Sequence, residues 1–504
     1  MWLPLCLLLP LLGVTEGARN GRLIRQQLHQ FRETQSWKSF YTRLGVPRGA
    51  MSYTAAVEGY ITQPLDHFNR LSNATYKQRY WINEAFWQRP NGPVFLYIGG
   101  ESSLSEFSVL AGEHVDLAQT HGALLLSLEH RYYGSSINPD GLTLDGLRFL
   151  SSQQALADLA SFHLFVSQKY NLTLQNTWIC FGGSYPGSLS AWFRLKFPHL
   201  VYAAVASSAP VRAELDFTDY NKVVSQSLSD AVIGGSPKCR DAVRVGFQSV
   251  DSILQTGNTS QLEEDFSSCA PLHGPNDYTE FVSNLADIFM GAVQYNGEGQ
   301  NIDVRRICQI MTSAKSGYDG LKSINRRFLE NTVLKCVDNS YEKSVADLNS
   351  TSQSMIGVGE RQWYYQTCTE FGYYQTCENN ICPFSQRITL HSQLDLCPLV
   401  FQIPKEYVHQ SVQYTNEFYG ADRPKSSRII FVNGDIDPWH ALSVLKNQSR
   451  SEIAIFINGT AHCANMSPSH ESDLPSLKKA REEIAVQIAE WLKSARKKPQ
   501  DMEY

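Results

Sequence analysis

The sequence lacks any excess of positive charge, with 44 Lys and Arg residues against 49 Asp and Glu and a formal net charge of −5. Nucleic-acid-binding chains usually concentrate basic residues on one surface, so we expect no nucleic-acid partner. Beyond its first residues the chain also lacks the long uncharged apolar stretch of a transmembrane helix, and we expect no stable membrane anchor. Internal repeats and low-complexity tracts are missing too. The composition, with 42% hydrophobic and 11% aromatic residues, is that of a folded globular protein.

The chain begins with an apolar segment that predicts a signal peptide. Residues 1–14 are apolar but too short to cross a bilayer, and Thr15 to Gly17 offer small residues of the kind that precede signal-peptidase cleavage. The start of this segment lacks the usual Lys or Arg. We expect removal of residues 1–17, followed by a polar and basic N-terminal arm or propeptide over residues 18–50.

Sequons and cysteines agree with passage through the secretory pathway. Seven Asn-x-Ser/Thr sequons occur, and that of Asn465 is a poor acceptor because a proline follows its serine. After Cys6 the chain holds ten cysteines, an even number that suits an oxidising compartment. We expect an endosomal, lysosomal or secreted protein that carries glycans at Asn73, Asn171, Asn258, Asn349, Asn447 and Asn458.

Eight of the cysteines lie between Cys239 and Cys397, and their pairing cannot be deduced from the sequence. Four residues separate Cys377 from Cys382, but no second pair with zinc-like spacing accompanies them. We therefore interpret this cysteine-rich part of the chain as disulfide-bonded, and we expect neither a metal nor another cofactor.

Apolar runs predict a sheet that is interrupted by a large insertion. Residues 57–62 and 76–82 alternate as antiparallel edge strands do, whereas continuous apolar runs predict strands buried on both faces of a helix-covered parallel sheet. From about residue 213 to 399 the chain is polar, rich in cysteine and mostly helical in pattern, with helical stretches expected at residues 249–254, 281–290 and 304–311. The predicted buried strands are 93–98, 123–128, 177–180, 202–208, 428–432 and 452–457, and the predicted helices that flank the sheet are 154–170 and 474–493.

Ser184 lies in the segment 181–187 (FGGSYPG), between a predicted strand and a predicted helix. A serine at such a sharp turn, with glycines directly before it, is typical of a nucleophile elbow, in which the turn lifts the hydroxyl clear of the sheet. Asp437 and His462 each follow a later predicted strand, so all three residues are expected at the same edge of the sheet. The order Ser, Asp, His is that of α/β-hydrolases.

This order predicts a catalytic triad on an α/β-hydrolase core. His462 would remove the proton of the Ser184 hydroxyl, and Asp437 would orient and stabilise the imidazole. The backbone N–H of Tyr185 and one near Gly100 would bind the oxyanion. We divide the chain into core residues 51–212 and 400–496, a cap over residues 213–399 and a C-terminal tail over residues 497–504.

Each member of the triad has a rival. Asp435 precedes Asp437 in the same loop, but its place at the strand end favours a structural turn. His470 lies further from its strand than His462 does. The other candidates, which we expect to be structural, buried or paired, are His130, His440, Cys180 and Cys463.

Four segments together resemble the serine peptidase family of prolyl carboxypeptidase and dipeptidyl peptidase II. They are residues 129–134 (EHRYYG), 182–187 (GGSYPG), 433–439 (NGDIDPW) and 459–462 (GTAH). The resemblance extends over residues 55–495. The chain departs from the general elbow pattern at Pro186, where a glycine is usual, and from the two named peptidases at Cys463, where a second histidine is usual.

The resemblance implies an exopeptidase that cleaves beside proline, in acidic vesicles or outside the cell, under a disulfide-stabilised helical cap. The substrate is then a peptide, and the existence of a homodimer stays open. Tyr185 and Trp439 would line a slot for a proline ring, and Glu101 and Glu370 would pair with a free amino terminus. The family context further suggests peptide trimming in endosomes or lysosomes for antigen presentation in the thymus. The alternatives are a serine esterase or lipase on the same core and a catalytically silent glycoprotein that acts as a binding module.

Overall fold

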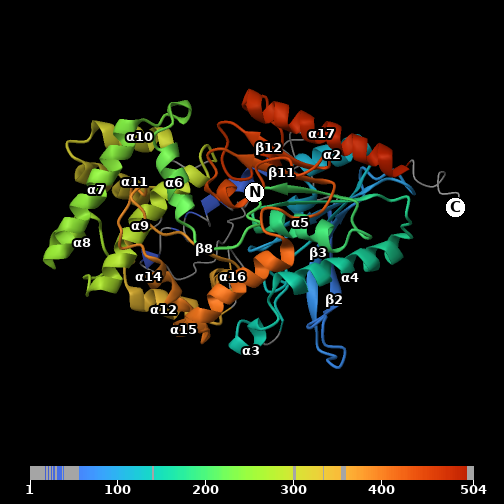
Figure 1. The fold of residues 1–504 in the computed structure, drawn as a ribbon, viewed down its shortest axis with the longest axis horizontal. Coiled ribbons are helices and arrows are strands. Elements are labelled where there is room, and N and C mark those ends of the chain that lie inside the picture. The colour runs from blue at the N-terminus through green and yellow to red at the C-terminus, as the bar shows by residue number, and fades with distance from the viewer. Residues whose placement is uncertain are drawn as a thin grey trace, which may run out of the picture.

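The computed structural model describes residues 56–138, 141–298, 302–332, 334–352 and 359–496, together with residues 17–18, 21, 24, 27–28, 31–36 and 38. The predicted signal peptide lies outside the described residues except for Gly17, as does the whole predicted tail 497–504. Figure 1 shows the two parts of the molecule, a helical cap at the left and a sheet covered by helices at the right.

Eight strands form one sheet, and β6, which leads to Ser184, lies in its middle. The strand order is β12-β11-β7-β6-β4-β5-β3-β2. Neighbours run parallel from β12 to β5, whereas β3 pairs antiparallel with both β5 and β2, as the alternating patterns predicted. The bounds are β2 (Ala56–Pro64), β3 (Thr75–Asn83), β4 (Val94–Ile98), β5 (Leu124–Leu128), β6 (Trp178–Gly183), β7 (Ala203–Ser207), β11 (Ile429–Gly434) and β12 (Glu452–Ile457).

Helices cover both faces of this sheet. Successive residues of a strand point to opposite faces, and accordingly Phe95 packs in one hydrophobic cluster and Leu96 in another. The Phe95 cluster includes residues of α2 (Glu113–His121) and α17 (Pro475–Arg496), and the Leu96 cluster includes residues of α4 (Ser152–Tyr170) and α5 (Tyr185–Lys196). Figure 1 shows α17 and α2 above the sheet and α4 below it. The core is therefore the predicted α/β-hydrolase.

The cap is mainly helical, and the three helical stretches expected at 249–254, 281–290 and 304–311 lie within α7, α9 and α10. The exact boundaries between cap and core stay predictions. The helices of this part of the chain are α6 (Thr218–Ser227), α7 (Pro237–Thr256), α8 (Ser260–Asp265), α9 (Pro275–Gln294), α10 (Val304–Ser313), α11 (Gly317–Glu330), α12 (Tyr341–Asn349), α13 (Glu360–Gln366), α14 (Leu390–Leu394) and α15 (Leu396–Phe401). The next helix, α16 (Lys405–Tyr419), lies in the second predicted core segment.

Shorter elements complete the fold. The two-residue strand β1 (Gly17–Ala18) runs parallel to β9 (Cys336–Val337), and β8 (Glu214–Asp216) runs parallel to β10 (Gly372–Tyr374). The short helix α3 (Leu144–Leu147) lies in the segment between β5 and α4. Among the described residues, none of the helices combines the length and the apolar character needed to cross a bilayer.

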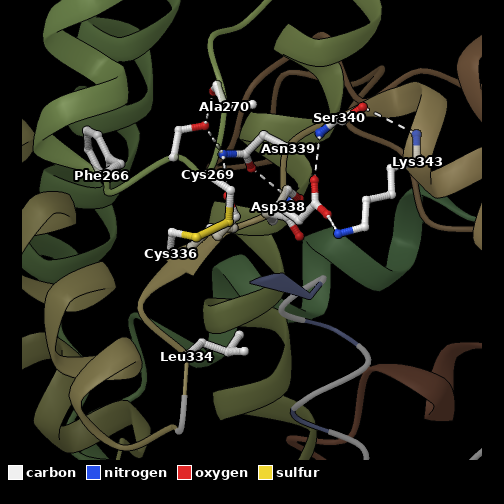
Figure 2. Close-up of a disulfide and its surroundings, with 12 residues drawn as sticks. Phe266, Cys269, Ala270, Leu334, Cys336, Asp338, Asn339, Ser340 and Lys343 are labelled. Atoms are coloured by element: carbon white, nitrogen blue, oxygen red, sulfur yellow. Dashed lines mark hydrogen bonds and ion pairs between the residues drawn. A yellow bond between two sulfur atoms is a disulfide. The ribbon is translucent and has the colours of Figure 1, made fainter. Parts of the chain in front are cut away.

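Four disulfides cross-link the cap, and Figure 2 shows the bond between Cys269 and Cys336 beside the hydrogen-bonded turn of Asp338 and Asn339. The eight cysteines expected to pair do so. The pairs are Cys239–Cys308, Cys269–Cys336, Cys368–Cys397 and Cys377–Cys382. The remaining described cysteines, Cys180 and Cys463, are buried free thiols of the core.

The six favoured sequon asparagines are all exposed. The seventh, Asn465, keeps only 2% of its surface accessible. Burial therefore adds a second reason, besides the following proline, for Asn465 to carry no glycan.

Candidate active site

Ser184 lies directly after β6, in a backbone conformation that a side chain rarely adopts. Its φ of 65° and ψ of −135° lie outside the broadly allowed regions, and such strain is typical of functional turns. The N–H of Ser184 donates to the carbonyl of Ser207 at the end of β7, at 2.9 Å. The turn is thus held by the neighbouring strand, and the side chain of Ser184 is half-buried at the rim of the sheet.

Asp437 and His462 form a buried pair, in the turns after β11 and β12 at one edge of the sheet. The Nδ1 atom of His462 lies 2.9 Å from Oδ1 of Asp437, and these residues are 3% and 0% exposed. A carboxylate only accepts hydrogen bonds, so Nδ1 carries the hydrogen and Nε2 is the ring nitrogen able to take a proton. Asp437 Oδ1 also accepts the N–H of Trp439 at 3.1 Å.

The turn after His462 packs against the turn that carries Ser184. The N–H of Cys463 donates to Ser208 Oγ at 2.8 Å, one residue beyond the carbonyl that binds Ser184. A Cβ built on Gly183 would lie 2.8 Å from Cys463 Sγ, so only glycine permits this approach. Within the part of the chain that the structure describes, the Ser184 hydroxyl makes no hydrogen bond. Hydrogen bonds of catalytic groups are often long in enzymes without substrate.

The pKa of His462 lies well above its ordinary value. Burial lowers the pKa, but the negative charge of Asp437, the neighbouring Cys463 and their hydrogen bonds to the ring outweigh that effect. The carboxylate therefore stabilises the imidazolium that a general base forms during catalysis.

The alternative candidates for the triad make other contacts or are exposed. Asp435 Oδ1 accepts the N–H of Gly459 at 2.7 Å and so ties the two loops together. His470 is exposed. His440 and His130 both bond to backbone carbonyls through Nδ1, and burial lowers the pKa of His130 to about 4. Burial raises the pKa of the Cys180 thiol to about 12, which keeps it unreactive.

The two expected oxyanion donors both lie at the elbow or beside it. Tyr185 is the first residue of α5, where N–H groups have no partner within the helix. Gly100 follows β4 and lies so close to Pro186 that a Cβ at position 100 would collide with the proline ring. The absence of a side chain at Gly100 thus brings this backbone next to the nucleophile turn.

The expected substrate-binding residues are in three different environments. Trp439 is 8% exposed and packs against the rings of Phe217, Tyr220 and Tyr373. Glu370 is buried, and burial raises its pKa, while its oxygens accept from Ser152 and Gln366. Glu101 lies after β4, and its carbonyl accepts the N–H of Gly359 at 3.3 Å.

The aromatic ring of Tyr185 is turned away from the solvent. It is 1% exposed, and its hydroxyl lies 3.0 Å from His130 Nε2 and 3.1 Å from Gln366 Nε2. Packing therefore accounts for the Tyr185 side chain.

The cap contributes a residue that no sequence pattern singles out. Gln294 ends α9, and its carbonyl accepts the N–H of His462 at 3.0 Å. Its side chain accepts from Tyr220 at 2.6 Å and from Trp439 Nε1 at 3.0 Å, and donates to the Tyr295 hydroxyl at 2.6 Å. A polar residue at a helix end carries no local signal for these contacts.

The N-terminal arm also reaches this side of the site. Arg32 binds Glu298 through two hydrogen bonds of 2.7 and 3.0 Å, and its guanidinium lies 5.6 Å from the Tyr295 ring centroid. That ring in turn lies edge-on to His462, with centroids 6.1 Å apart. Ile24 is buried against Gly291 of α9. Whether the arm is a propeptide stays a prediction.

The described residues include no group of three or more His, Cys, Asp and Glu placed to hold a metal ion. The chemistry available at this rim is that of a hydroxyl, an imidazole and a carboxylate.

Comparison with known proteins points to one group of enzymes. Residues 63–484 match the family described as serine carboxypeptidase S28. The chain is 44% identical to the thymus-specific serine protease of Homo sapiens, over 98% of this chain and 97% of that protein. It is 28% identical to the lysosomal Pro-X carboxypeptidase of Bos taurus, over 86% of this chain and 87% of that protein.

Proposed function

We propose that this chain, which belongs to the serine carboxypeptidase S28 family, cleaves peptides with Ser184, Asp437 and His462 as its catalytic triad. Membership confirms the family resemblance of the four motifs and makes the chain a serine peptidase of the exopeptidase type. The observation that supports the triad most directly is the buried contact of 2.9 Å between His462 and Asp437, in a turn packed against the nucleophile elbow.

In the proposed reaction, His462 Nε2 takes the proton of the Ser184 hydroxyl as its oxygen attacks the substrate carbonyl. Asp437 holds the imidazolium, and the N–H of Tyr185, with a backbone donor near Gly100, stabilises the oxyanion. His462 then protonates the departing amine. A water molecule, deprotonated by the same histidine, hydrolyses the acyl-enzyme and regenerates the hydroxyl.

The finer proposal is trimming of peptide ends beside proline in endosomes or lysosomes, as part of antigen presentation in the thymus. The cap supports the choice of an exopeptidase, because the end of α9 contacts His462. A site covered in this way would admit a chain end and exclude a folded loop. Trp439, which is 8% exposed, is the candidate for the flat apolar surface that would suit a proline ring. The names of the two relatives, a lysosomal carboxypeptidase and a thymus-specific protease, agree with the proposed compartment and tissue.

A fluorophosphonate probe tests the proposed nucleophile. We expect covalent labelling of the wild-type protein and none of Ser184→Ala. Folded wild-type protein that resists the probe would exclude the triad. Digestion of a peptide library, read by mass spectrometry, tests the finer proposal, because exopeptidases yield ladders from one end and internal cuts do not.

A further inference from the structure

A buried carboxyl group lies directly behind the nucleophile turn. Glu113, the first residue of α2, is 6% exposed, and its Oε2 accepts a hydrogen bond of 2.9 Å from Asn465 Nδ2. The same amide nitrogen donates to Ser207 Oγ at 3.0 Å. Asn465 is itself 2% exposed. One buried amide therefore joins α2 to the end of β7.

Both Asn465 and its partner Ser207 belong to the framework of the candidate triad. Ser207 supplies the carbonyl that binds the N–H of Ser184. Asn465 lies three residues after His462, in a short helical turn, Ala464–Met466. Met466 of this turn contacts the Cα of Gly183 so closely that a Cβ there would collide with its sulfur. A shift of this turn would therefore move the base and the nucleophile relative to each other.

A small cavity between α2, β6, β7 and this turn adds an independent observation. Its volume of about 10 Å³ is at the lower limit of the space that one water molecule needs, and it is lined by Glu113, Phe181, Ser207, Asn465 and Met466 among others. Within the described part of the chain, Glu113 Oε1 is buried and has no hydrogen-bond partner. Burial of a carboxyl group at this place costs free energy that an apolar side chain would not.

We propose that Glu113 is a positioning residue for the peptidase reaction, which holds Asn465 and thereby the turn that carries His462 against the strand end that carries Ser184. This inference rests on the proposed triad. Glu113 touches neither the substrate nor the reacting atoms. Its effect is on the distance between hydroxyl and imidazole, to which rates are very sensitive.

The charges around Glu113 come from two helices. Arg481 of α17 lowers its pKa, and Asp116 of α2 raises it, but burial dominates and brings the pKa to about 7. Arg481 also donates to the carbonyls of Ser467 and Ala464, so it clamps the same turn from the other side. Glu113 is accordingly neutral in an acidic compartment and ionises as the pH rises through about 7.

The test compares Glu113→Leu, which removes the acceptor, with Glu113→Gln, which keeps an acceptor but cannot ionise. The readout is the rate of Ser184 labelling by a fluorophosphonate, resolved into a maximal rate and a half-saturating probe concentration. For Glu113→Leu we expect a maximal rate lower by about 100-fold with little change in half-saturation. Glu113→Gln should stay close to wild type at pH 5.

Glu452 provides a matched control. It is also buried in this sheet, at 4% exposure, with a raised pKa, but it lies at the start of β12, at the opposite end of the strand from His462. We expect Glu452→Leu to label at the wild-type maximal rate. Equal losses in the two leucine variants, or no loss in a folded Glu113→Leu, would overturn the inference.

A second measurement covers the case in which Glu113→Leu fails to fold. A raised carboxyl pKa stabilises the folded protein below about pH 4.5, and this contribution is lost as the pH rises through about 7. The melting temperature of Glu113→Gln should therefore fall less than that of wild type between pH 5 and pH 8. An identical fall would refute a titrating Glu113 at this site. Wild-type protein that does not label at all would instead refute the triad, so the two proposals fail separately.

Discussion

The sheet and the cap both contribute to the candidate site, but they are stabilised in different ways. The sheet delivers Ser184 and Asp437 from turns after strands that are buried on both faces, and His462 from the turn after the edge strand β12. Within the described residues, all four disulfides lie in the cap, and the two cysteines of the core are free thiols. Two hydrophobic clusters fill the core, and one of them continues into the cap through residues such as Phe247 and Phe289. The cap adds covalent links to this apolar packing, and these links restrict its unfolded states.

The two regions meet at the backbone of His462. The cap supplies the carbonyl of Gln294, the core supplies the hydroxyl of Ser208 to the next residue, and together they fix both sides of this turn. The cap is therefore more than a cover that limits access to the rim. Substitutions in each region in turn should distinguish effects on the catalytic step from effects on the stability of the cap and its contact with the core.

The largest effect is expected from the core pair. Asp437→Asn leaves the shape unchanged but favours the wrong tautomer of His462, and we expect kcat to fall by about 10⁴-fold, as in other triads. The measurement is the hydrolysis rate on a peptide identified from the library.

Asp435→Asn is the control in the same loop. Asp435 bonds to the N–H of Gly459 and not to the imidazole, so the variant should keep most of its activity. If Asp435→Asn were the more damaging change, the assignment of the acid would have to be exchanged.

Next in size is the loss of a cap disulfide. Cys269 and Cys336 are 67 residues apart, and replacing both by alanine should lower the free energy of unfolding by about 4 kcal/mol in the chain-entropy model. Cys377 and Cys382 are only 5 residues apart, and replacing both should lower the free energy of unfolding by about 2 kcal/mol. Denaturant titration of both double variants measures the difference. Equal losses would show that loop length does not govern cap stability.

A smaller effect is expected at the junction. Gln294→Ala keeps the carbonyl that binds His462 but removes the side-chain oxygen that accepts from the hydroxyl of Tyr220 and from the indole of Trp439. An unsatisfied buried donor costs about 1–3 kcal/mol, so kcat/KM should fall by about 10-fold or more. Gln248→Ala, on the exposed face of α7, is the control and should be silent. If kcat/KM of Gln294→Ala equals that of the wild type, the hydrogen bonds of this side chain do not contribute to catalysis.

The smallest effect is a shift in pH dependence. His462 acts as a base only when neutral, and its raised pKa places the increase of kcat/KM at a pH above about 6.5. Cys463→Ala removes one cause of the raised pKa and should move the profile toward lower pH. By linkage, the contribution of His462 to stability is present below about pH 6.5 and lost as the pH rises through the folded-state pKa. A profile that is flat from pH 5 to 8 contradicts the assignment.

Much of the core was predictable because its signals are local. Apolar runs predicted β4 and β5, alternation predicted the antiparallel β2 and β3, and the glycines before Ser184 marked the turn after β6. Asp437 and His462 follow two further apolar runs that predicted parallel strands. Since parallel strands end on one side of a sheet, both residues were expected at the same rim.

The cap and the supports of the site were not predictable in this way. Helical periodicity indicated α7, α9 and α10, but no pattern joins Cys239 to Cys308 or Gln294 to His462. In the sequence, Glu113 is not distinguishable from other acidic residues at the start of a helix. Its proposed role becomes visible only in the folded structure, where α2 packs against the turn of Asn465.

Residue order and local pattern were thus enough to specify the α/β core, the nucleophile turn and the order of the candidate triad, because strand burial and turn chemistry act over a few neighbouring residues. Disulfide pairing, the contact of the cap with His462 and the buried environment of Glu113 arose from folding. Each depends on which surfaces pack together over long separations in the chain, and such packing energies belong to the assembled molecule rather than to any segment.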